Sequence, residues 1–138
     1  MSPRFSVTPV GVRIVQLGSP RAPGEGIRLG TVRRPPRGVA KADYARLNYY
    51  DVWLPELAPS AELLKWALSQ PLTGRRWETF ARRYRAEMSH PPASRMLELL
   101  AALSGQVSLS VGCFCDDERS CHRSVLRDLL VQAGATLV

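Results

Sequence analysis

The feature that most constrains the fold is an alternating apolar segment, residues 107–114 (VSLSVGCF), that stands between two amphipathic segments. Alternation with a period of two predicts a strand, whose apolar side carries Val107, Leu109, Val111 and Cys113. Residues 93–103 before it and 121–133 after it repeat apolar residues every three or four positions, which predicts helices. A strand between two helices favours an α/β fold with at least partly parallel strands.

The remaining segments extend this pattern toward the N-terminus. Further strands are predicted by alternating or aromatic and branched residues at 10–17, 27–32 and 49–54, with a last short strand at 135–138. The first two would form a hairpin-like or a crossover pair. Helices are predicted at 60–69, where Ser60 is a suitable N-cap, and at 73–88, where the aromatic residues follow helical spacing.

These elements predict one small α/β domain over residues 10–138, with a mixed or partly parallel sheet flanked by about four helices. Residues 1–9 are expected to be an N-terminal tail or an edge strand. In the predicted helices 60–69 and 93–103, leucines are expected on the buried side, among them Leu68, Leu99 and Leu103.

Composition excludes several classes of protein. Apolar residues make up 45% of the 138 residues and charged residues 22%, which is typical of a globular domain and not of a disordered or fibrous chain. No apolar run approaches the roughly 20 residues that span a bilayer, and no secretory signal is apparent, so a cytoplasmic protein is expected. Three cysteines within nine residues fit a reducing compartment better than a disulfide framework.

The basic residues are almost all arginine. Nineteen Lys and Arg against twelve Asp and Glu give a net charge of +7, with lysine only at Lys41 and Lys65. Arginine prefers planar partners such as carboxylate and phosphate. Nucleic acid is therefore one candidate partner, through the arginines at positions 75–85 of the predicted 73–88 helix, and a solvated basic surface is the alternative.

The loop after the 107–114 strand is the candidate functional site. It leads to a helix predicted to start with Ser120 as N-cap and with Cys121, His122 and Arg123 in its first turn. Unpaired N–H groups and the positive dipole end make such a turn an anion site, at the sheet edge where α/β folds bind ligands. Arg123 would clamp the anion, His122 would act as acid or base, and Ser124 would add a hydroxyl.

The cysteines around this turn allow three interpretations. The positive helix end is expected to lower the pKa of Cys121 and favour its thiolate. Cys113 and Cys115 could instead pack as small apolar residues. Four soft groups are also what a zinc site needs, but the spacing lacks two separated pairs, and neighbouring helical residues point about 100° apart. We therefore assign no metal ligands from the sequence.

A second cationic segment, residues 33–38 (RRPPRG), is expected to be a stiff loop because its prolines exclude a regular helix. Arg34 and Arg37 are candidate ligand-binding residues there, together with Cys115 and Ser124 near the first site. Whether this loop approaches the Cys121-His122-Arg123 turn is not determined by the sequence. A solvated basic turn is the competing interpretation.

Several segments resemble the bacterial family called domain of unknown function 488, in its YeaO-like branch. Residues 34–41 (RPPRGVAK), 51–60 (DVWLPELAPS) and 77–87 (WETFARRYRAE) are similar to family segments, and so is the Cys-His-Arg ending of 113–123. The resemblance covers about residues 10–134, and it departs from the family before the proline-arginine-glycine turn and in the extra segment 41–51. It implies a small α/β fold with shared polar positions, and it brings no established activity.

The sequence thus favours an enzyme or binder that acts on an anionic or nucleotide-like small molecule at Cys121, His122 and Arg123. A nucleic-acid-binding module and a zinc-stabilised interaction domain are the alternatives. The residues identify no cofactor and leave the oligomeric state open.

Overall fold

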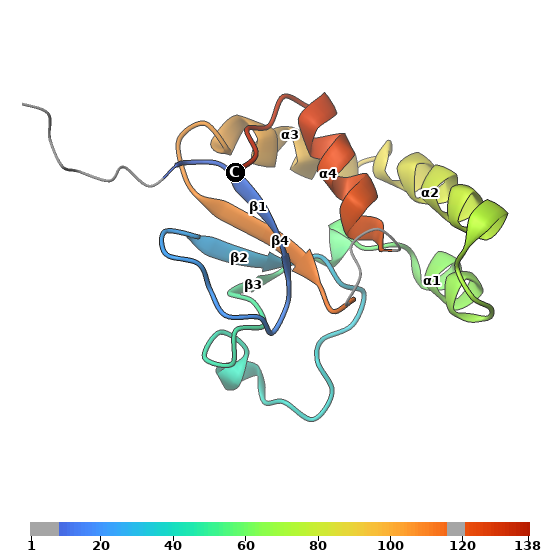
Figure 1. Cartoon of the computed structure of the whole chain (residues 1–138), viewed down its shortest axis with the longest axis horizontal. Helices are drawn as coiled ribbons and strands as arrows, with labels where there is room; N and C mark the ends of the chain where they lie inside the picture. The colour runs from blue at the N-terminus through green and yellow to red at the C-terminus, as the bar shows by residue number, and fades with distance from the viewer. Residues whose placement is uncertain (1–8, 116–120) are drawn as a thin grey trace, which may run out of the picture.

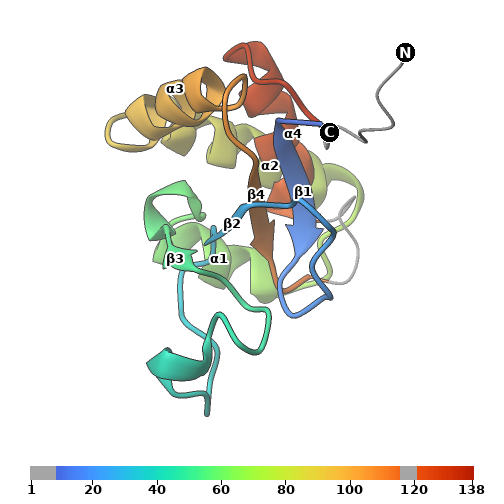
Figure 2. The same cartoon turned by 90° about the vertical axis from the view of Figure 1, so that its left-hand side faces the viewer.

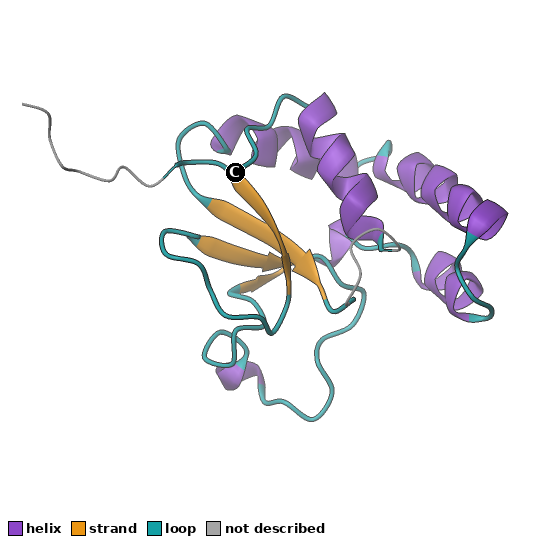
Figure 3. Ribbon diagram, viewed as in Figure 1, coloured by secondary structure: helices purple, strands orange, loops and turns teal. Residues whose placement is uncertain are grey.

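The protein is a small α/β domain built on a four-stranded sheet (Figures 1 and 3). The computed structural model describes residues 9–115 and 121–138. The strands lie in the order β1, β4, β2, β3, with bounds Val12–Gln16, Leu109–Cys113, Ile27–Gly30 and Val52–Trp53 respectively. All three pairings are parallel. The expectation of an α/β sheet with parallel strands is confirmed.

The central position of β4 decides how the first two strands relate. β1 and β2 were predicted as a hairpin-like or a crossover pair, but they are not neighbours, because β4 pairs with both. Parallel neighbours need long crossover connections, and the helical part of the chain supplies the one that leads into β4. At the C-terminus, the predicted strand 135–138 is reduced to one parallel bridge between Leu137 and Val12.

The helices lie on one side of the sheet (Figure 2). They are α1 (Ala61–Leu68), α2 (Gly74–Met88), α3 (Ala93–Leu103) and α4 (His122–Gln132). Short 3-10 helices, η1 (Lys41–Asp43) and η2 (Pro55–Leu57), precede them in the long connection after β2 and after β3. No helix of the described chain is both long and apolar enough to cross a membrane.

The main core lies between the helices and one face of the sheet. It combines Leu29, Leu109 and Val111 of the strands with residues of all four helices, including Phe80 and Tyr84 of α2. The helical spacing of the aromatic residues correctly predicted which side of α2 is buried. It was wrong for three leucines: Leu68 is 77% exposed, Leu99 58% and Leu103 36%, because α1 and α3 turn other residues inward, among them Leu63, Ala67, Leu97 and Ala101.

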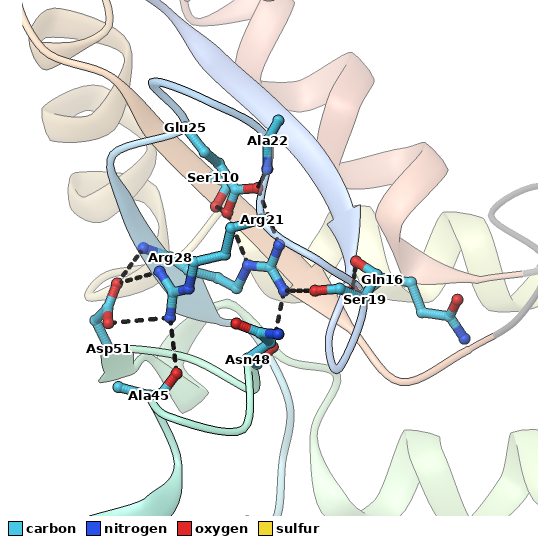
Figure 4. A network of polar contacts seen from close by, with 10 residues as sticks. All are labelled: Gln16, Ser19, Arg21, Ala22, Glu25, Arg28, Ala45, Asn48, Asp51 and Ser110. Carbon is cyan, nitrogen blue, oxygen red and sulfur yellow. Dashed lines mark hydrogen bonds and ion pairs between the residues drawn. The ribbon is translucent and has the colours of Figure 1, made fainter.

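The opposite face of the sheet carries a buried polar network (Figure 4). Arg28 of β2 is fully buried and donates from Nε and Nη2 to the two carboxylate oxygens of Glu25, at 2.7 and 2.9 Å. Its Nη1 donates to the carbonyls of Ser19 and Asn48, and Ser110 of β4 donates its hydroxyl to Glu25. These bonds tie the loop before β2 and the loop before β3 to the sheet.

Candidate thiol and imidazole site

The candidate site lies where β4 ends and α4 begins. Cys113 is the last residue of β4, and Cys121 is the N-cap residue of α4, with the extended dihedral angles φ −129° and ψ 151°. The sequence placed Cys121 in the first helical turn, but the helix starts one residue later, at His122. The predicted N-cap Ser120 lies outside the described residues. Cys121 thus lies outside the helix, so a helical step does not set the angle between its side chain and that of His122.

Three soft donor groups converge at this point. The sulfur atoms of Cys113 and Cys121 are 2.7 Å apart, and Cys121 Sγ lies 3.6 Å from His122 Nδ1. All three donor atoms lie within 4.8 Å of one another, and all three residues are buried. The two cysteines are also packed against apolar residues of the second, smaller core, including Leu17 and Val32. The donor cluster is therefore shielded from water on the sheet side.

The orientation of His122 is fixed by the carbonyl of Thr31, just after β2. His122 Nε2 lies 2.7 Å from this oxygen, and because a carbonyl only accepts, Nε2 must carry the ring proton. The Nδ1 lone pair then faces the sulfur of Cys121. The ring also receives the edge of Tyr84 of α2, with centroids 5.4 Å apart. Burial lowers the pKa of His122 to about 4, so the ring is neutral at pH 7.

Contact among the three thiols shifts their pKa values in different directions. Hydrogen bonds from Cys113 and Cys121, aided by the positive charge of Arg123, lower the pKa of Cys115 to about 3. For Cys121, the hydrogen bond with Cys113 lowers the pKa, but the bond with Cys115 and burial outweigh it and raise the pKa to about 11. The pKa of Cys113 is raised by its bonds to both other thiols. The sequence predicted a lowered pKa for Cys121, whereas burial and the bond with Cys115 raise it, and the pKa of Cys115 is lowered instead.

Arg123 holds the end of the cysteine loop instead of facing open solvent. Its side chain is 4% exposed, and Nη2 donates to the carbonyl of Cys115 at 2.6 Å. Its Nε is buried and has no hydrogen-bond partner within residues 9–115 and 121–138. Ser124 donates its hydroxyl to the carbonyl of Cys121 at 3.0 Å. Both residues thus position the two cysteines through their backbone.

A pocket of about 500 Å³ opens beside this cluster. Cys115, Cys121 and His122 form one wall of it. The rest is mainly apolar and comes from α1, the loop between α1 and α2, and α2, through Pro59, Leu64, Ala67, Leu68, Ser69, Gln70, Pro71, Leu72 and Phe80. The volume and the mainly apolar lining are typical of small-molecule sites. The pocket lies near the carboxyl end of β4, beside the loop in which the sequence predicted a site.

The proline-arginine loop lies outside this pocket. Arg34 and Arg37 line a shallower hollow of about 380 Å³ with Tyr49 and Phe114. Arg34 also lines a hollow along α1, which shares Leu64, Leu68 and Ser69 with the first pocket. The structure therefore brings Cys113, Cys115, Cys121, His122 and Arg123 together, and it places Arg34 and Arg37 in neighbouring hollows.

Most of the arginine face of α2 is occupied by contacts within the protein. Arg76 lies over the ring of Trp66 at 4.1 Å and donates to the carbonyls of Trp66 and Pro71. Arg83 lies over the same ring, and Arg85 pairs with Asp128 of α4. Such contacts reduce the number of cations available to a nucleic acid, so the geometry does not favour this alternative.

Two residues that position the site were missed by the sequence analysis. Thr31 contributes a backbone carbonyl, and its own hydroxyl donates to the carbonyl of Gly112. Tyr84 packs against His122 and donates its hydroxyl to the carbonyl of Leu57. A backbone carbonyl leaves no mark in a sequence, and Tyr84 was recognised only as part of an aromatic stripe. Neither role could be inferred before the elements were placed.

Comparison with known proteins identifies the family of this chain. A family model named DUF488-N3a, described as an active DUF488-N3 subclade, matches residues 12–134. The match includes all four strands, all four helices and the cluster of Cys113, Cys121 and His122. Neither a curated protein nor a solved structure matches the chain.

Proposed function

The chain belongs to the DUF488 family, and on that premise we propose that it is an enzyme that acts on a small anionic molecule in the pocket beside Cys115, Cys121 and His122. The observation that carries the proposal is the convergence of these three side chains on one wall of a mainly apolar pocket. The description of the matching subclade as active also supports a catalytic role.

The pocket favours a ligand with an apolar or ring-shaped body. Leu64, Leu68 and Phe80 offer apolar contact on the walls that come from α1 and α2. A volume of about 500 Å³ suits a molecule of nucleotide-like size. The polar wall is small, so it would orient one reacting group while the apolar walls exclude water from the rest of the molecule.

Two positive features lie near the polar wall, so that one can balance a Cys115 thiolate and the other an anionic group of the ligand. The cation of Arg123 is buried beside Cys115, and the N-terminus of α4 adds its positive dipole end at His122. Positive charge in a site shielded from water interacts more strongly with an anion than it would at the surface. Cys115 would contact the reacting group, because both ring nitrogens of His122 are engaged by Thr31 and Cys121. Arg123 and Ser124 would keep the cysteine loop in place.

A binding screen with a matched pair of variants tests this proposal. The wild-type protein is screened by thermal shift against nucleotides, phosphorylated metabolites and small carboxylates, and hits are measured by calorimetry. Leu68→Trp fills one side of the pocket and is expected to weaken binding at least about tenfold, which corresponds to 1.4 kcal/mol.

The matched control is Leu99→Trp, which changes another exposed leucine, on α3, that does not line this pocket. It is expected to leave the affinity unchanged. A panel without any hit, or an equal effect of both variants on every hit, would contradict the proposed site.

A further inference from the structure

We propose that Cys113, Cys121 and His122 form a binding site for a soft divalent cation of the zinc class, with the fourth coordination position open toward the pocket. This inference rests on the proposed function, since it names the reactive centre of the same site. The cation would polarise or bind the anionic group of the ligand, as three-ligand zinc sites do.

The donor set and its spacing fit zinc. Zinc binds thiolate sulfur at about 2.3 Å and imidazole nitrogen at about 2.0–2.1 Å in a tetrahedral arrangement, which places a sulfur and a nitrogen ligand about 3.6 Å apart. Cys121 Sγ and His122 Nδ1 are 3.6 Å apart. Two sulfur ligands would lie about 3.8 Å apart, so Cys113 and Cys121, now at 2.7 Å, must separate by about 1 Å.

The surroundings of His122 support ligation by its Nδ1 atom. Metal-binding histidines almost always donate their other ring N–H to a carboxylate or a carbonyl, which fixes the tautomer and the ring plane. The bond from His122 Nε2 to the carbonyl of Thr31 does this at 2.7 Å. The observed distance of 3.6 Å between Cys121 Sγ and His122 Nδ1 removes the objection raised by the sequence, because it shows that these two neighbouring side chains converge.

The placement of the three ligands relative to the pocket indicates that the fourth coordination position of the cation faces the pocket. Cys113 is buried and does not line the pocket, whereas Cys121 and His122 do. Cys115 is exposed and lines the pocket, and its thiol hydrogen-bonds with Cys113 and Cys121, but it is not in the group of three whose donor atoms all lie within 4.8 Å of one another. We therefore place Cys115 beside the open position and not among the three ligands. On binding, the thiols of Cys113 and Cys121 would each release a proton to solvent, while neutral His122 already offers a lone pair.

The test starts with the wild-type protein, purified without chelators or metal-affinity resin from zinc-supplemented cells. Elemental analysis is expected to find one zinc per chain. Replacement by Co²⁺ under anaerobic reducing conditions is expected to give the intense visible bands of a tetrahedral site and a thiolate charge-transfer band. Absence of zinc together with a weak octahedral cobalt spectrum would overturn the proposal. So would a Cys113–Cys121 disulfide in protein prepared under reducing conditions.

Matched alanine variants then identify the ligands. Cys113→Ala, Cys121→Ala and His122→Ala are expected to weaken zinc binding at least about 100-fold, more than changes in the surrounding shell usually do. Cys115→Ala is expected to change the affinity less than about tenfold. If Cys115→Ala weakens zinc binding as much as the other three variants do, Cys115 is a fourth ligand and the proposal of an open position is wrong. If a variant does not fold, the stoichiometry and cobalt spectrum of the wild type still decide the proposal.

The two proposals fail separately. Zinc content and cobalt spectra are measured without any organic ligand, and the ligand panel is screened on both zinc-loaded and chelated protein. If the protein binds zinc but its ligand affinity is the same in the zinc-loaded and the chelated form, the cation is not part of the reactive centre. If the protein binds zinc but no ligand of the panel, the proposed substrate class is wrong and the proposed metal site still stands.

Discussion

At the scale of single residues, the ion pair of Glu25 and Arg28 shows how this small domain accommodates a buried charge. Arg28 is fully buried, and its guanidinium donates to two carboxylate oxygens and two carbonyls. Burial raises the pKa of Glu25, but the hydrogen bonds from Arg28, Ser110 and Ala22 outweigh it and lower the pKa from 4.5 to about 2. A buried pair is stable only when both partners keep their hydrogen bonds.

Replacement of Glu25 by glutamine is therefore expected to lower the free energy of unfolding by about 3–5 kcal/mol at neutral pH, because Arg28 loses its counter-charge. The pKa of Glu25 is lower in the folded state, so its stabilising contribution is present above about pH 4.5 and is lost as the pH falls toward 2. Urea unfolding at several pH values measures both effects. The difference in unfolding free energy between wild type and variant should become smaller as the pH falls.

The control for this prediction is Glu98→Gln, which removes the carboxylate of an exposed pair with Arg95. Its effect on stability is expected to stay within about 1 kcal/mol at every pH. If the difference in unfolding free energy between wild type and Glu25→Gln stays constant across the acidic range, the lowered pKa of Glu25 is contradicted.

At the scale of elements, the start of α1 is fixed by its own N-cap and by α2. The hydroxyl of Ser60 accepts from the backbone N–H of Leu63, as the sequence predicted, and donates to the carboxylate of Glu87. The backbone N–H of Ser60 donates to the same carboxylate. Because α1 forms one wall of the pocket, this double link also sets the position of Leu64 and Leu68.

Ser60→Ala removes the N-cap bond and leaves one oxygen of Glu87 without its hydroxyl donor. We expect a loss of about 0.5–2 kcal/mol in the free energy of unfolding, the usual cost of an N-cap. The matched control is Ser69→Ala at the other end of α1, where the hydroxyl donates only to the carbonyl of Trp66 and is exposed. Urea unfolding of both variants checks this, and equal losses would argue against a special role for Ser60.

At the scale of the whole molecule, close approach of the backbones at the centre of the sheet determines the architecture. Gly112 of β4 stands in register with Val15 of β1 on one side and with Gly30 of β2 on the other. A Cβ atom at Gly112 would lie 2.5 Å from the carbonyl oxygen of Val15. A larger residue would push β1 away from the strand that carries Cys113.

Gly112→Ala is therefore expected to destabilise the protein by about 1–3 kcal/mol, as overpacking usually does, and to disturb the cysteine cluster at the end of the same strand. Gly105→Ala is the control, because a Cβ atom there meets open space. Thermal and urea unfolding compare the two. If Gly112→Ala leaves the free energy of unfolding unchanged, β1 can move away from β4 without loss of stability.

Local pattern was sufficient to predict most elements of this protein. The spacing of apolar residues predicted α2, α3 and β4 within a few residues, and Ser60 marked the start of α1. These predictions succeeded because propensity and periodicity depend on neighbours along the chain. The exposed positions of Leu68 and Leu99 were missed because helical periodicity identifies an apolar side but not which residues the neighbouring elements cover.

What the sequence alone offered about the site was a prediction of its place, at the loop that joins the β4 strand to the Cys121-His122-Arg123 turn. Only the tertiary structure decided its chemistry. Thr31, distant in sequence, fixes the tautomer of His122, and contact among the three thiols moves the favoured thiolate from Cys121 to Cys115. The reason is physical: burial and hydrogen bonds across the fold determine proton positions and pKa values, and neither can be read from spacing along a chain.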